Sequence, residues 1–125
     1  MSPTLLVIAA VLLAALGVLH SILGERLIIR SLVRRDDLPP VLGGQAYTAG
    51  VIRLAWHFTS MLAIGLAAVL AVIASGSDWR AIVIAIGVTC LACAVLPVIS
   101  TRGRHVSWAV FLAAGVLCLA AAIIG

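Results

Sequence analysis

Residues 3–23 read PTLLVIAAVLLAALGVLHSIL, a run of 21 residues without one Asp, Glu, Lys or Arg. The hydrocarbon core of a bilayer is about 30 Å thick, and an α-helix that rises about 1.5 Å per residue crosses it with roughly 20 apolar residues. The run is therefore long enough and apolar enough to form a transmembrane helix. Arginines follow the run and none precedes it. A cleavable signal peptide has the reverse order of charge, so we expect this helix to be retained.

Three more apolar runs follow, at approximately residues 51–75, 81–99 and 106–124. The connections between them are short, and the longest is the loop over residues 24–50. Backbone polar groups cannot stay unpaired in lipid, so each run is expected to be a helix. We therefore predict an all-α membrane protein, a four-transmembrane-helix bundle that forms one transmembrane domain over residues 1–125.

The composition excludes several classes of protein. The chain is 65% hydrophobic and 10% charged, whereas soluble domains are about 45–50% apolar and about 25% charged. A soluble domain of this size has too much surface for its volume to bury so many apolar side chains. A cytosolic enzyme, a disordered tail and a secreted disulfide scaffold are all excluded on this ground.

The arginines predict the orientation of the bundle. Seven of the eight lie in or beside the first and third loops, and only Arg80 flanks the second. Cytoplasmic loops carry the excess of basic residues, so both termini are predicted to lie outside. This rule also accounts for the net charge of +4, and we expect no nucleic-acid partner. We expect a multi-pass protein of the cell inner membrane, of bacterial type.

The first loop carries a basic stripe. Arg26, Arg30 and Arg34 are spaced i, i+4 and i+8, so they share one face of a helix that continues from the first span to about residue 35. Two aspartates and two prolines over residues 36–40 end that helix. The stripe is predicted to contact lipid headgroups. The alternative is that the three side chains only extend to the membrane surface, with no specific ligand.

The candidate functional residues are polar side chains at the edges of the spans, where lipid penalises them. His20, His57 and His105 all fall at cytoplasmic span ends, so the topology places the three histidines in one leaflet. His20 and His57 share faces with small residues, which let helices approach closely in membranes. We expect these faces to meet, with Glu25 reaching the histidines or pairing with Arg53.

This cluster suggests a cofactor. Three imidazoles and a carboxylate suit a transition metal (Fe, Zn or Cu), with His20, His57, His105 and Glu25 as ligands. Two facing histidines, His20 and His57, would also suit axial ligation of haem b. The alternative is that these histidines form hydrogen bonds between helices.

The function therefore stays open among three hypotheses. The first is a metal- or haem-binding protein with its site at the cytoplasmic leaflet. The second is a non-catalytic accessory or scaffold subunit that acts through helix packing, as a homo-oligomer or within a larger membrane complex. The third is a small transporter or channel. The sequence has no phosphate-binding glycine loop, no nucleophile elbow and no paired intramembrane carboxylates, which disfavours hydrolases and nucleotide-driven enzymes.

Overall fold

A computed structural model describes residues 2–42 and 44–124 and confirms the predicted all-helical fold. The elements, in chain order, are α1 (Pro3–Gly24), the π-helical turn η1 (Glu25–Ile29), α2 (Arg30–Leu32), α3 (Gln45–Ala74), α4 (Trp79–Thr101) and α5 (Ser107–Ile124). In this described part of the chain, four continuous helices are long and apolar enough to cross a membrane. The first of them runs without a break from α1 through η1 into α2.

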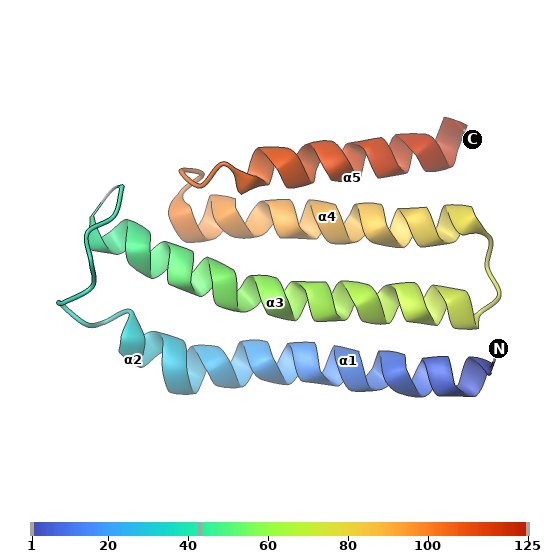
Figure 1. Cartoon of the computed structure of the whole chain (residues 1–125), viewed down its shortest axis with the longest axis horizontal. Helices are drawn as coiled ribbons and strands as arrows, with labels where there is room; N and C mark the ends of the chain where they lie inside the picture. The colour runs from blue at the N-terminus through green and yellow to red at the C-terminus, as the bar shows by residue number, and fades with distance from the viewer. Residues whose placement is uncertain (1, 43, 125) are drawn as a thin grey trace.

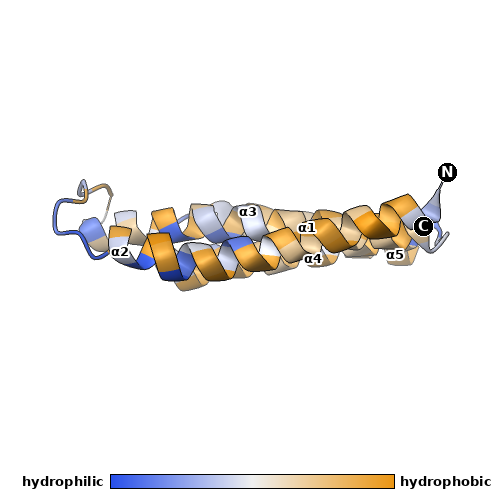
Figure 2. Cartoon of the chain, turned by 90° about the horizontal axis from the view of Figure 1, so that it is seen from below, coloured by the Kyte–Doolittle hydropathy of each residue, from blue (hydrophilic) through white to orange (hydrophobic). Residues whose placement is uncertain are grey.

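The long helices lie side by side in a row that follows the order of the chain (Figure 1). Among the described residues, α1 packs on α3, α3 on α4 and α4 on α5. Both termini lie at one end of the row. The opposite end carries α2, the first turns of α3 and α5 and the last turn of α4, and Figure 2 shows that hydrophilic residues gather there. We call it the arginine-rich end, and the charge rule predicts that it faces the cytoplasm.

Small residues allow the close packing of neighbouring helices. A Cβ atom on Gly17 of α1 would lie 2.8 Å from the backbone oxygen of Ser60 in α3. Gly87 of α4 and Gly115 of α5 face each other's backbones, since a Cβ atom on either would lie within 3.2 Å of the other's carbonyl oxygen. A Cβ atom at Gly17 or Gly115 would force its neighbours to shift, and one at Gly87 would be tightly packed, so these helix interfaces favour glycine.

Two helix boundaries differ from the sequence expectation. α3 begins at Gln45, six residues before the predicted span, and Gly44 precedes its first turn. Thr48, whose side chain makes it a candidate N-cap by residue type, lies inside the helix instead. The Thr48 hydroxyl donates a hydrogen bond to the backbone oxygen of Pro39 (2.6 Å), so it ties the first loop to the helix. The first helix passes the predicted membrane edge, as expected, but it ends at Leu32.

Candidate functional site

The centre of the candidate site is the carboxylate of Glu25, the first residue of the π-helical turn. Arg53 of α3 binds it through two bonds, with Nε donating to Oε2 (3.1 Å) and Nη2 donating to Oε1 (2.9 Å). His57, one turn further along α3, donates from Nε2 to Oε2 (3.2 Å). The side chain of Glu25 is 22% exposed and that of Arg53 is 39% exposed. The predicted Glu25–Arg53 pair is confirmed, and the same carboxylate also holds His57.

Two histidine–serine pairs connect α1 and α3 reciprocally. Ser21 of α1 bonds to Nδ1 of His57 (2.7 Å), and His20 of α1 bonds through Nδ1 to the hydroxyl of Ser60 in α3 (2.9 Å). A carboxylate only accepts hydrogen bonds, so the bond to Glu25 assigns a proton to Nε2 of His57. In neutral His57, Nδ1 then accepts from the Ser21 hydroxyl. The polar faces of the first two spans meet as the sequence predicts.

Trp56 occupies the space beside His20. The two rings stack with centroids 4.4 Å apart and planes 4° from parallel, and the indole Nε1 donates to the backbone oxygen of His20 (3.0 Å). A Cβ atom on Gly24 would overlap the indole, so only glycine admits the ring at this position. Trp56 lies near a span end, a position typical of the interfacial aromatic belt, so its place in the sequence does not predict this contact. The sequence signal for this contact was Gly24, the small residue one helical turn after His20.

We refer to Glu25, Arg53, His57, Ser21, His20, Ser60 and Trp56 together as the α1–α3 clamp. Its members lie on one helix interface, because the two helices run antiparallel and residues early in α3 meet residues late in α1. In the described part of the chain, no buried side-chain nitrogen or oxygen lacks a hydrogen-bond partner. The polar groups that lipid would penalise are therefore satisfied within the chain.

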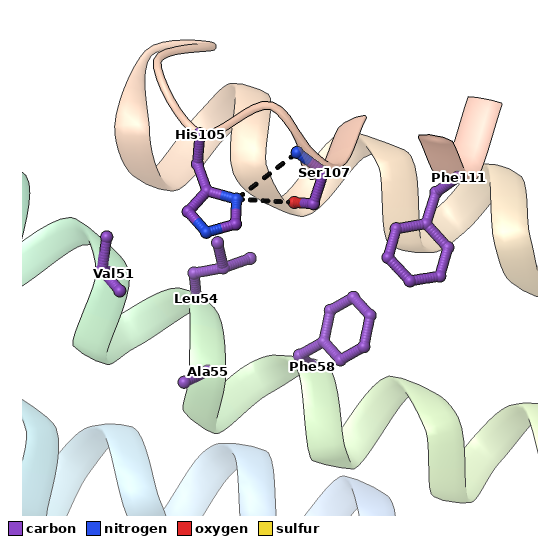
Figure 3. A pocket seen from close by; sticks show the side chains of 7 residues that line it. All are labelled: Val51, Leu54, Ala55, Phe58, His105, Ser107 and Phe111. Atoms are coloured by element: carbon purple, nitrogen blue, oxygen red, sulfur yellow. Dashed lines mark hydrogen bonds between the residues drawn. The ribbon is translucent and has the colours of Figure 1, made fainter. Parts of the chain in front are cut away.

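His105 lies away from the clamp. It precedes α5 and lines a cavity of about 310 Å³ between α3 and α5 that is otherwise largely apolar (Figure 3). Its Nδ1 bonds to the hydroxyl of Ser107 (2.8 Å) and accepts from the backbone N–H of that residue (3.4 Å). His105 thus provides an acceptor for the first backbone N–H of α5. The phenyl rings of Phe58 and Phe111 lie against each other in the same cavity, with their centroids 4.9 Å apart.

The predicted four-ligand metal site is not assembled. Over residues 2–42 and 44–124, no group of three or more His, Cys, Asp or Glu side chains lies close enough to hold a metal ion. His105 is separated from Glu25 because α5 packs on α4 and not on α1. His57 and Glu25 remain adjacent, but Arg53 places a fixed positive charge on the same carboxylate. A cation at that carboxylate would meet this charge.

The basic stripe touches the clamp through one of its three arginines. Arg26 and Arg34 are exposed, and Arg30, 60% exposed, has Nε 3.8 Å from Oε1 of Glu25. Arg26 lies within the π-helical turn and Arg30 directly follows it, so the two are not related by the α-helical spacing that the sequence suggested. Contact of these side chains with lipid headgroups stays a prediction.

No protein family, no curated protein and no solved structure matches this chain.

Proposed function

We propose that this chain is a small multi-pass membrane protein that works as a non-catalytic accessory subunit, with the α1–α3 clamp holding its shape. The observation that carries the proposal is the reciprocal bonding of the two histidines. His57 bonds to Ser21 through Nδ1 and to Glu25 through Nε2, and His20 bonds to Ser60. Both imidazoles are thus used as interhelical hydrogen-bonding groups, a known role of histidine in membranes.

A metal or haem site is less well supported by the same geometry. A metal that bound His57 would have to replace one of its two hydrogen bonds and share Glu25 with the Arg53 guanidinium. A haem iron held by both histidines would have to separate His20 from the indole of Trp56, on which it stacks. Either change would break contacts that connect α1 to α3.

A transport path is disfavoured because the polar residues stop halfway along the interface. Beyond His20 and Ser60, α1 has only Thr4 near its end, and α3 has no polar side chain over residues 61–74. Ala10 and Ala67, which are buried in this half, continue the apolar interior. A proton or ion relay needs polar groups through the full thickness of the membrane.

The surface left for a partner lies on the outward faces of the row. Gly17, whose small size suggests a face for a partner helix, is instead used against α3 within the chain. The outer faces carry large apolar side chains, such as Leu12 of α1 and Leu117 of α5, which are 65% and 69% exposed. Contacts with a partner would therefore use these branched side chains. The partner is either a second copy of this chain in a homo-oligomer or another protein in a larger complex.

The test is the mass and metal content of the untagged protein, extracted from its native membrane in polymer-bounded lipid discs. The proposal expects discs that hold further copies or a second protein in fixed ratio, with metal far below one equivalent. The matched variants are His57→Gln and Glu25→Gln. Monomeric discs without a partner would refute the proposal. Near-stoichiometric iron, zinc or copper that both variants lose would also refute it, in favour of a metal centre.

A further inference from the structure

A second polar region lies at the arginine-rich end, between the start of α3 and the end of α4. It is a cavity of about 410 Å³ whose lining includes Arg53, Arg102 and Arg104 and contains no acidic residue. Sites for small ligands typically measure about 300–1,000 Å³. The clamp uses only one of these three arginines. The cavity therefore has an excess of positive charge that the proposed accessory role does not explain.

Two of the arginines are held in place. Nη2 of Arg104 donates to the backbone oxygen of Leu42 (3.1 Å), and its guanidinium lies over the ring of Tyr47, 5.7 Å from the centroid. Arg53 is fixed through Nε and Nη2 by Glu25, which leaves Nη1 for a further acceptor. Side chains that are ordered in advance lose less entropy when they bind a ligand.

Arg102 lines the cavity because it directly follows the last residue of α4. Its backbone adopts a left-handed conformation (φ 53°, ψ 40°) as it leaves the helix, and its N–H bonds to the backbone oxygen of Pro97. Glycine is the usual residue here, because left-handed backbone disfavours a side chain. In the described part of the chain, the side chain of Arg102 has no hydrogen bond or ion pair. Its charge more than balances the partial negative charge of the helix end.

We propose that this cavity binds the phosphate group of an anionic phospholipid. A guanidinium matches phosphate with two parallel hydrogen bonds. Three arginines line this cavity, one from α3 and two from the loop that follows α4. The lining also includes Ile99, which is 73% exposed. This apolar edge beside the charge fits a lipid, whose glycerol and acyl chains continue from the phosphate, better than a free ion. The cavity is separate from the stripe formed by Arg26, Arg30 and Arg34, none of which lines it.

The experiment uses the full chain in lipid discs of phosphatidylcholine with a minor fraction of phosphatidylglycerol, and native mass spectrometry to count the lipids retained. The cavity variant is Arg102→Gln with Arg104→Gln. The control is Arg26→Gln with Arg34→Gln, which removes the same charge from the same end of the protein outside the cavity. Circular dichroism establishes that both variants are folded. Arg104→Lys provides a second variant that retains the charge and loses the planar donor pair.

We expect phosphatidylglycerol to be retained in preference to phosphatidylcholine. The cavity variant should bind it at least about tenfold more weakly, because each removed guanidinium takes away charge-assisted hydrogen bonds. The control should bind as the wild type does, and Arg104→Lys should be intermediate. Equal losses in the cavity variant and the control would overturn the proposal in favour of general surface charge. Equal retention of the two lipids would also overturn it.

A separate arm identifies the source of the phosphate. Inorganic phosphate is titrated into lipid-free protein in neutral detergent and followed by the ³¹P signal. We expect weak binding of the free ion to the lipid-free protein. In the lipid discs, we expect an equal concentration of inorganic phosphate not to displace phosphatidylglycerol. Tight binding of inorganic phosphate that disappears in the cavity variant would overturn the assignment to a lipid. Neither arm depends on the accessory role, since a monomer would show the same lipid preference.

Discussion

The substitution Gly24→Ala tests the packing of the clamp with the smallest change available. The new Cβ atom would lie 2.5 Å from Cζ2 of Trp56 and closer still to two other indole atoms. A rigid indole cannot bend away from such a contact, so Trp56 must rotate out of its position. That rotation separates it from the ring and the backbone oxygen of His20.

The magnitude follows from the interactions that Trp56 gives up when it rotates. The hydrogen bond to the His20 oxygen contributes about 0.6 kcal/mol, as is typical between membrane helices, and the stacked rings contribute about 1 kcal/mol. Forcing an extra atom into a packed interface costs a further 1–3 kcal/mol, roughly. Alanine offsets about 1 kcal/mol of this loss, because its helix propensity is higher than that of glycine. We expect Gly24→Ala to lower the free energy of unfolding by about 2–4 kcal/mol.

The assay is reversible unfolding in mixed micelles with increasing dodecyl sulfate, followed by circular dichroism. Leu23→Ala is the control, because Leu23 is adjacent on the same helix and 48% exposed, and its effect should be the smaller one. In a Trp56→Leu background the clash is absent, so Gly24→Ala should become neutral or stabilising there. If Gly24→Ala is at least as stable as the wild type, or has the same effect in both backgrounds, the close contact is refuted.

Three further predictions concern other residues. Gly17→Leu should separate α1 from α3 and lower the unfolding free energy by about 2 kcal/mol or more; a changed oligomeric mass at unchanged stability would contradict this. Ser21→Ala removes the hydroxyl bonded to His57 and should cost about 0.6 kcal/mol and shift the ¹⁵N signal of Nδ1, whereas Ser21→Thr should retain that signal. Hydrogen bonding to Arg35 lowers the pKa of Asp37, so the stability this pair gives is present above the unfolded-state pKa and is lost as pH falls through the folded pKa. In an NMR titration, Arg35→Gln should raise the midpoint of Asp37, and an unchanged midpoint would exclude the pair.

The spans could be predicted because lipid imposes a simple rule on sequence. A run such as residues 3–23 has no stable place in water, and its length matches the membrane. The contact between α1 and α3 could also be predicted, because the polar side chains near the ends of the two spans are expected to face each other and not the lipid. The Glu25–Arg53 pair follows from that register, because opposite charges at one depth attract.

The position of His105 could not be predicted in the same way. Hydropathy predicts how deep a residue lies in the membrane, but not which helix packs beside it. Three histidines at one predicted depth therefore suggested a single cluster. The structure separates His105 because it lies beside Val51 and Leu54 of α3, whereas His57 of the same helix bonds to Ser21 and Glu25. The π-helical turn at Glu25–Ile29 was missed for a related reason. Helix propensity does not distinguish a π-helical turn from an α-helical one.

The row of helices has a consequence for how the protein is made. Each long helix packs on the one that precedes it in the chain, so a helix that enters the membrane finds its partner already synthesised. All residues of the clamp lie within the first 60 residues of the chain. The clamp can therefore close before α4 and α5 leave the ribosome, and no late helix has to be inserted between earlier ones. Contacts between helices that are adjacent in the chain also form fastest, since the loops to be closed are short.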